Sequence, residues 1–306
     1  MNRREFLQST ATGSAALTIS LSAPAVSNAV FAPTAAFPAL DAFTFNTIQV
    51  NGRGNVVTIA PGEARYFNEV LSDTESLNMI AVQSYRPWLG NTDRSQNISP
   101  YEARPQSIDI APFYLGRTAV TQGQWRAVAA LPMVAKEIDP EPACFSGDNH
   151  PVECVSWHDA QEFCLRLSAK SGRNYRLPLE AEWESACRAG TISPFHYGAT
   201  LSSELANYSA LHSYDSEVHG IYRRSTVPVG QFTPNAFGLS DMHGNVWEWC
   251  ADSWQSGADN ANRRVLRGGS WADPPVKLRS ASRMGYAAES LNRVIGFRIA
   301  LSLEAA

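Results

Sequence analysis

The sequence has no long run of basic residues, no low-complexity tract and, after its N-terminus, no apolar run long enough to cross a membrane. With 25 Lys and Arg against 29 Asp and Glu, the formal net charge is −4. A nucleic-acid-binding face would need clustered basic side chains, and a membrane span would need about 20 consecutive apolar residues. We therefore expect neither a nucleic-acid partner nor a transmembrane segment in the mature protein.

Cysteine is too scarce for a secreted disulfide scaffold, and its spacing matches no CxxC zinc or redox motif. Because there are five cysteines, at least one thiol stays unpaired. The chain leaves room for one bridge, such as Cys144–Cys154. Cys164 and Cys187 fall on apolar helix faces, which favours inert, buried thiols. Because 44% of the residues are hydrophobic and eight are tryptophans, we expect side-chain packing to stabilise the core.

The N-terminus has the features of an export signal. Arg3 and Arg4 precede a weakly apolar run, 11–21, and residues 27–29 have the small side chains that a signal peptidase reads. The alternative is a flexible N-terminus with two chance arginines. We predict a twin-arginine signal peptide over 1–29, a bacterial source, and a periplasmic or extracellular location. An Ala/Pro-rich linker is expected over 30–41.

Strands dominate the pattern that follows. Alternating apolar residues predict a strand over 43–50, a tight turn over 51–54, and a second strand from 56. Residues 84–107 are polar and favour a loop. We therefore expect a β-rich extension, 42–109, that packs on the main domain.

Three helices are indicated in the middle of the chain. Thr121 suits the N-cap of a helix over 122–130. Ser156 and Asp159 resemble a capping box for a helix that Gly172 ends. Pro178 suits the first turn of a third helix, which Gly190 ends.

Helical signals fade beyond Gly190, and short strands are expected at 227–229, 265–267 and 295–301. Helices followed by irregular β structure indicate the α+β class.

Six ordered sequence blocks between residues 110 and 300 resemble the formylglycine-generating (sulfatase-modifying) enzyme family. The resemblance implies that residues 110–303 form a C-type-lectin-like α+β domain with much irregular structure. The blocks are FYLG to VTQGQW (113–125), PVECVSW (151–157), YRLP with EAEWE (175–184), GLSDMHGNVWEW (238–249), RGGSW (267–271) and GFR (296–298).

The resemblance also implies a structural calcium ion. Its ligands would be the side chains of Asp241 and Glu248 and the carbonyls of Gly244 and Val246, since hard oxygen ligands suit Ca²⁺. The alternative is a loop held only by hydrogen bonds and tryptophan packing. A second calcium site of the family transfers poorly, because Asn207 and Tyr208 have no clear downstream acidic partner.

Catalytic residues of the family are missing. Its enzymes bind copper(I) through a cysteine pair shortly after the Gly-Gly-Ser block, and thiolates are the ligands that copper(I) prefers. Residues 268–283 contain no cysteine, so copper is not expected. The related iron-dependent sulfoxide synthases use histidines of an N-terminal domain, and no histidine precedes residue 110. His212, Asp215, Glu217 and His219 form a loose cluster that favours solvated loop residues over a metal site.

The C-terminal segment instead resembles variable proteins of diversity-generating retroelements. Arg279, Ser280, Ala281, Arg283, Arg293 and residues 295–298 match fixed positions of those proteins. The alternative is ordinary drift in a non-catalytic homologue. Trp254, Trp271 and Tyr286 are candidate aromatic anchors that could equally belong to the core. The predicted ligand-binding face comprises Ala272, Asp273, Pro274, Val276, Ser282, Gly285, Tyr286, Ala287, Ser290 and Leu291.

The function that we predict from these patterns is an exported, non-catalytic module that binds a protein or small-molecule ligand through this face. One alternative is a metal-dependent oxidoreductase of the sulfatase-modifying family. Another is an accessory subunit that positions a second exported protein.

Overall fold

Two main sheets and three helices carry the fold in the computed structural model, which describes residues 39–91, 101–255 and 262–303. All of these residues belong to one unit, Phe31–Ala306. The predicted signal peptide, residues 1–29, lies outside the described residues. No helix of the described part is both long enough and apolar enough to cross a membrane.

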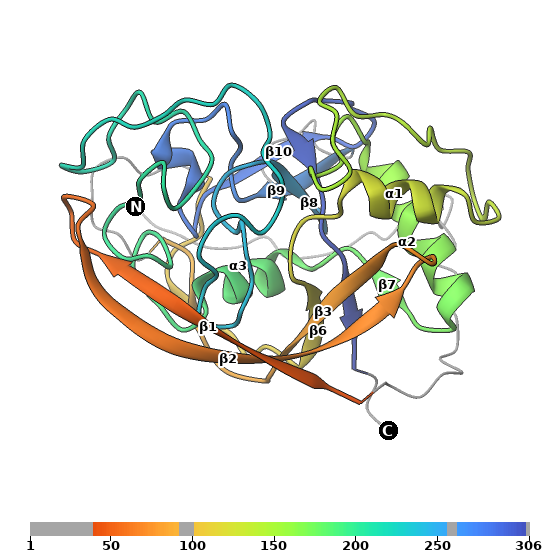
Figure 1. The fold of residues 1–306 in the computed structure, drawn as a ribbon, viewed down its shortest axis with the longest axis horizontal. Helices are drawn as coiled ribbons and strands as arrows, with labels where there is room; N and C mark the ends of the chain where they lie inside the picture. Colours follow the sequence, from red (N-terminus) through yellow and green to blue (C-terminus); the bar gives the residue numbers. More distant parts are fainter. Residues whose placement is uncertain (1–38, 92–100, 256–261, 304–306) are drawn as a thin grey trace, which may run out of the picture. The chain divides into compact units, whose positions relative to one another are not determined.

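A six-stranded antiparallel sheet joins the N-terminal strands to the main domain. The predicted turn at 51–54 connects the first two strands into a long curved hairpin (Figure 1). This sheet spans the boundary expected between residues 109 and 110, because β3 (Ser76–Val82) pairs with β6 (Phe113–Gly116) through Val82 and Phe113. The strand order is β1 (Asp41–Val50), β2 (Val56–Val70), β3 (Ser76–Val82), β6 (Phe113–Gly116), β12 (Ala300–Ser302) and β7 (Tyr175–Arg176).

All three predicted helices form, and the first two begin where their capping residues indicate. Helix α1 (Gln122–Ala129) is capped by Thr121, and α2 (Trp157–Ser171) by the Ser156–Asp159 capping box. Gly172 ends α2 at φ 68°, in the left-handed region that glycine adopts readily.

The start of helix α3 (Glu180–Arg188) differs from the prediction. Its N-cap is Leu179, so Pro178 precedes the helix instead of lying in its first turn.

The second sheet has four strands in the order β10 (Arg283–Ala287), β9 (Arg263–Arg267), β8 (Trp247–Ser253) and β11 (Ile295–Gly296). Two strand predictions need correction. Residues 227–229 form no strand, and 295–301 split into β11 and β12, which belong to different sheets. A third correction concerns the loop expected over 84–107, where β4 (Trp88–Leu89) pairs with β5 (Gln106–Ser107).

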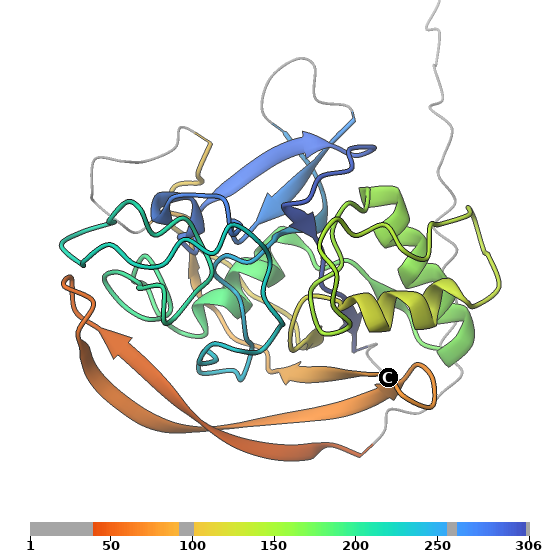
Figure 2. The same cartoon turned by 45° about the horizontal axis from the view of Figure 1, so that its top comes forward.

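The core lies on both sides of α3. In both views α3 runs between the β1–β2 hairpin and the four-stranded sheet (Figures 1 and 2). Trp183 and Cys187 of α3 pack with Ile80 of β3 and with Val265 of β9. The predicted α+β class is therefore confirmed.

Candidate functional site

The predicted calcium loop is tightly held by hydrogen bonds. Asp241 and Asn245 adopt left-handed backbone conformations, with φ 58° and 66°. The Asn245 side chain accepts hydrogen bonds from the Asn207 side chain (3.1 Å) and the Val227 amide (3.0 Å). A Cβ at Gly244 would lie 2.3 Å from the Asn207 carbonyl oxygen, so this position requires glycine.

The two predicted carboxylate ligands differ in their surroundings. Asp241 Oδ2 accepts a hydrogen bond from the Gly230 amide at 2.6 Å, while the buried Oδ1 has no hydrogen-bond partner. Burial raises the pKa of Asp241 to about 6. The negative charge of Glu248 is already balanced by Arg298, which donates to both carboxylate oxygens (2.6 and 2.8 Å). The Trp183 indole also donates to Oε2 (2.6 Å). Asp241 thus fits a cation ligand and Glu248 does not, and the calcium site stays a prediction that rests on Asp241.

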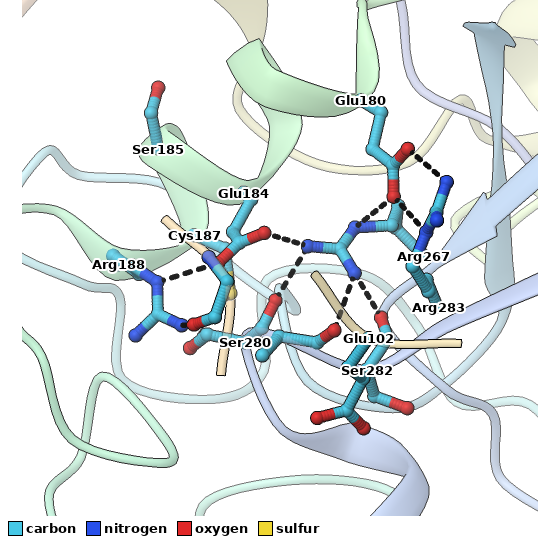
Figure 3. A network of polar contacts seen from close by, with 12 residues as sticks. Glu102, Glu180, Glu184, Ser185, Cys187, Arg188, Arg267, Ser280, Ser282 and Arg283 are labelled. Carbon is cyan, nitrogen blue, oxygen red and sulfur yellow. Dashed lines mark hydrogen bonds and ion pairs between the residues drawn. The ribbon is translucent and has the colours of Figure 1, made fainter. Parts of the chain in front are cut away.

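An arginine that has no exposure to solvent fixes the backbone of the C-terminal segment (Figure 3). Arg267 of β9 donates to the carbonyls of Ser280 (2.8 Å) and Ala281 (3.0 Å), and it also binds the carbonyl of Ser282. Glu184 of α3 accepts from the same guanidinium at 2.6 Å. Because the arginine satisfies three successive carbonyls, the backbone of 280–282 has little freedom.

Two further arginines anchor the same segment. Arg283 forms a bidentate pair with Glu180 (2.7 and 2.6 Å), as Figure 3 shows. Arg279 binds the Glu102 carboxylate, with one hydrogen bond of 2.9 Å. The residues that resemble fixed positions in this segment therefore hold its backbone in place.

Only part of the predicted ligand-binding face is accessible. Ala272 and Leu291 are exposed, and Pro274, Val276, Tyr286, Ala287 and Ser290 are partly buried. Ser282 and Gly285 are buried, so their assignment to a ligand-contacting surface is corrected here. A Cβ at Gly285 would lie 2.3 Å from the Trp254 ring.

Asp273 also needs correction as a face residue. Its Oδ2 accepts hydrogen bonds from the Trp247 indole (2.9 Å) and from the backbone and hydroxyl of Ser270. Asp273 is partly buried, and the candidate anchors Trp254 and Trp271 are buried. These three side chains hold the domain together instead of projecting from it.

The loose cluster at 212–219 contains one buried acid. Glu217 accepts hydrogen bonds from the amides of Tyr214 and Asp215, the latter at 2.9 Å. The carboxylate therefore closes a turn.

A groove of about 590 Å³ opens beside Leu291, where the C-terminal segment meets the start of α2. Leu291, a member of the predicted face, is 64% exposed. Apolar walls come from Trp125, Pro142 and Val155. The polar lining consists of Lys136, Asp139, Cys154, Ser156, His158, Asp159 and Glu289.

Residues remote in sequence also surround the buried Trp271. Phe145 meets its ring edge-on at a centroid distance of 5.5 Å, and Tyr222 stacks on it at 6.3 Å. The Arg293 guanidinium lies 5.5 Å from the same ring. Sequence reasoning missed these contributors and the α1–α2 side of the groove, because only the folded chain brings 125–159 and 222 to the C-terminal segment.

The sequence and structure match known proteins over most of the chain. A family model for the sulfatase-modifying factor enzyme 1-like domain matches residues 45–303. The chaperone protein LppX of Paenibacillus barcinonensis is 29% identical over 210 residues, which cover 54% of this chain and 71% of LppX. The inactive C-alpha-formylglycine-generating enzyme 2 of Bos taurus is 36% identical over 159 residues, which cover 49% of this chain and 50% of that protein. The chain thus spans about half the length of this second relative.

Two solved structures extend the likeness to the fold. PvdO from Pseudomonas aeruginosa is 29% identical with a TM-score of 0.65, and the match covers 78% of this chain and 98% of PvdO. Treponema denticola variable protein 1 is 24% identical with a TM-score of 0.60, and the match covers 77% of this chain and 98% of that one, which establishes a common fold alone. The chain therefore belongs to the formylglycine-generating enzyme family, as a sulfatase-modifying factor enzyme 1-like domain with the C-type-lectin-like α+β fold.

Proposed function

We propose that this protein is an exported, non-catalytic binding module that holds its ligand in the groove beside Leu291. The observation that carries the proposal is an exposed apolar side chain of the C-terminal segment at the rim of a groove of about 590 Å³. Concave sites with mostly apolar walls and a few polar groups are typical of ligand-binding sites. Leu291 is also one of the residues that the sequence assigns to a ligand-contacting face.

The side chains after the Gly-Gly-Ser block support a non-catalytic function. No cysteine occurs in residues 268–283. Asp273 is used by Trp247 and Ser270, and Leu278 is fully buried in the core. The likeness to an inactive formylglycine-generating enzyme 2 is in keeping with this proposal.

The groove favours a ligand with an apolar group and a positive charge. Three carboxylates line it, those of Asp139, Asp159 and Glu289. Lys136 forms an ion pair with Asp159, which leaves the acidic groups in excess. A basic and apolar segment of a protein, or a small cationic molecule, would satisfy both the walls and the charge.

Binding is tested by photo-crosslinking. A photoreactive residue at position 290, beside Leu291, captures the partner in cells that produce the full chain. The captured partner is then purified and titrated against the wild type, Leu291→Asn and Ile59→Asn, a control with a similar exposure of 63% on β2. We expect Leu291→Asn to weaken binding at least about tenfold, or 1.4 kcal/mol, and Ile59→Asn to leave it unchanged. Equal affinities for all three proteins would exclude the groove.

The non-catalytic part of the proposal has its own assay. A cysteine-containing sulfatase peptide is incubated with the protein, copper(I) and oxygen. We expect no formylglycine by mass spectrometry, whereas its formation would establish an enzyme.

Export is proposed from Arg3 and Arg4, which lie outside the described residues. Replacing both with lysine should retain the precursor in the cytoplasm. Export of the double variant at the wild-type level would contradict a twin-arginine signal.

Active diversification of the C-terminal segment is a separate proposal. It requires a near-repeat of the last hundred or so coding bases, differing at adenines, beside a reverse transcriptase gene. Sequencing the surrounding DNA decides the matter, since absence of such a repeat leaves ordinary drift.

The likeness to a protein named as a chaperone favours a second candidate, an accessory subunit that positions another exported protein. In that case the crosslinked partner would be an exported protein whose folding or yield falls when Leu291→Asn replaces the wild type.

A further inference from the structure

Two of the five cysteines meet at one end of the groove. The sulfur atoms of Cys144 and Cys154 lie 2.9 Å apart, although neither residue belongs to a helix or strand. Cys144 is exposed, and Cys154 is partly buried and lines the groove. Cys154 has φ 58°, and its amide donates to the Asn292 carbonyl at 3.1 Å. The backbone at Cys154 is therefore held against the C-terminal segment.

A buried carboxylate accompanies the two thiols. Glu153 has no exposure to solvent, and its Oε1 accepts a hydrogen bond from the Phe145 amide at 2.8 Å. The buried Oε2 has no partner within hydrogen-bond geometry, and the two thiols and the Cys144 amide lie beside the carboxylate. A buried carboxylate is costly unless it is paired or bound to a cation.

Cys144, Glu153 and Cys154 each offer one potential metal-ligand atom, and these three atoms lie close together. The two sulfur atoms and a Glu153 oxygen all lie within 4.8 Å of one another. Within residues 39–91, 101–255 and 262–303, this is the one group of three or more such side chains that could hold a metal ion.

We propose that Cys144, Glu153 and Cys154 form a binding site for a thiophilic divalent cation, for which zinc(II) is the best fit. Zinc(II) is bound by cysteine sulfur at about 2.3 Å and by carboxylate oxygen at about 2.0–2.2 Å. Two thiolates and a carboxylate carry three negative charges, which a divalent cation largely balances. The cation would also balance the charge of the buried Glu153 carboxylate.

The geometry leaves a tetrahedral ion one open position. Sulfur atoms on one such ion lie about 3.7 Å apart, so the thiols must separate by less than about 1 Å. Cys144 can make that adjustment because its side chain is exposed. Cys154 lines the groove, so the fourth position can take water or a donor atom of a bound ligand. The three ligands lie outside residues 268–283, and occupation of the site does not depend on the proposed binding function.

A Cys144–Cys154 disulfide is the rival product of the same proximity. It would leave the Glu153 carboxylate buried beside two uncharged sulfur atoms. A metal ion accounts for all three side chains, and for this reason we favour it.

The test is a cobalt(II) titration of the full-length protein after reduction and removal of metals. Cobalt(II) substitutes for zinc(II) and gives a thiolate-to-metal charge-transfer absorption that reports sulfur ligation. We expect one cobalt(II) per chain, with the absorption lost when zinc(II) is added. Cys144→Ser changes an exposed residue and should fold, yet it should lower the absorption and the affinity. Glu153→Gln should weaken binding at least about tenfold.

Matched controls keep the outcome specific. Cys164→Ala removes a buried thiol of α2, and Glu141→Gln removes a nearby exposed carboxylate, so both should bind cobalt(II) as the wild type does. Wild-type absorption that persists unchanged in Cys144→Ser and Cys154→Ser would overturn the proposal. So would a reduced wild-type protein that binds no cobalt(II), and a mass of the unreduced protein two hydrogens short would then assign the pair to a disulfide.

Discussion

The indole nitrogen of Trp247 lies 2.9 Å from Oδ2 of Asp273, and this contact ties β8 to the loop after the Gly-Gly-Ser block. Ser270 donates to the same oxygen through its amide at 3.1 Å and through its hydroxyl. One carboxylate oxygen thus satisfies three donors. The family resemblance places catalytic cysteines in this loop. In this chain the Asp273 carboxylate instead stabilises the loop through hydrogen bonds.

Replacing Asp273 with alanine should therefore destabilise the fold. The change leaves the Trp247 indole and the Ser270 amide without partners, which we expect to lower the free energy of unfolding by about 2–3 kcal/mol. Ala272→Ser, at the exposed neighbouring position, should change it by no more than about 0.5 kcal/mol. Urea unfolding of both variants measures the difference. If Asp273→Ala and Ala272→Ser were equally stable, Asp273 would again be a candidate for the ligand-binding face.

Gly285→Ala should be harmful for a steric reason. The added Cβ would meet the Trp254 ring at 2.3 Å, and overpacking of this kind costs about 1–3 kcal/mol. Leu291→Asn, which changes an exposed residue of the same predicted face, should leave the midpoint of thermal unfolding nearly unchanged. A Gly285→Ala protein as stable as the wild type would show that Trp254 can move aside, and would readmit this position to a variable surface.

These positions show where sequence reasoning succeeded and where it could not. Thr121, Ser156 and Gly172 determine helix ends through contacts within a few residues, so their roles follow from local sequence. The turn at 51–54 is local for the same reason. The family blocks identified the fold because they occur in order along the chain.

Burial in the C-terminal segment depends on distant partners instead. Ser282 is enclosed because Arg267 binds its carbonyl, and Gly285 because Trp254 packs over it. Neither contact leaves a periodic pattern near the residue. The pairing of Arg298 with Glu248 was equally hidden, since fifty residues separate them.

Calcium binding is best tested at Asp241. If the ion binds only the folded state, a chelator should lower the midpoint of thermal unfolding, and calcium should restore it. Asp241→Asn should abolish that response while keeping an acceptor for the Gly230 amide. Should chelator and calcium leave both proteins unaffected, the loop is held by its hydrogen bonds alone.

Glu248 is a poor site for the same test, and this gives a separate prediction. Glu248→Ala leaves the Arg298 guanidinium buried without its carboxylate, which we expect to cost about 3–5 kcal/mol whether or not calcium is present. Denaturant unfolding with and without chelator measures both quantities. A loss of stability that vanishes in chelator would instead assign Glu248 to the metal.

Acid should destabilise the protein through His243. Its Nδ1 donates to the Leu278 carbonyl at 2.6 Å, and its Nε2 accepts from the His196 amide at 3.0 Å, so the buried ring is held as one neutral tautomer. Burial lowers the pKa of His243 to about 4, against an ordinary value of about 6.5. Between these values the unfolded chain takes up a proton that the folded chain does not. Stability from this group is thus complete above pH 6.5 and is lost as the pH falls toward 4, by about 3 kcal/mol.

Two other titratable groups also change the acid-induced loss of stability, and the test must separate their effects from that of His243. Burial also lowers the pKa of His196, which adds to the loss, whereas the raised pKa of Asp241 means that protonation of its carboxylate partly offsets the loss below pH 6. We therefore expect the free energy of unfolding to fall from pH 7 to 4.5, and to fall less steeply in His243→Gln. Nitrogen-15 NMR of the wild type should find His243 in the Nδ1–H tautomer at pH 5. A ring that titrates near pH 6.5 would mean that protonated His243 is accommodated in the core, and the predicted acid sensitivity would then have another origin.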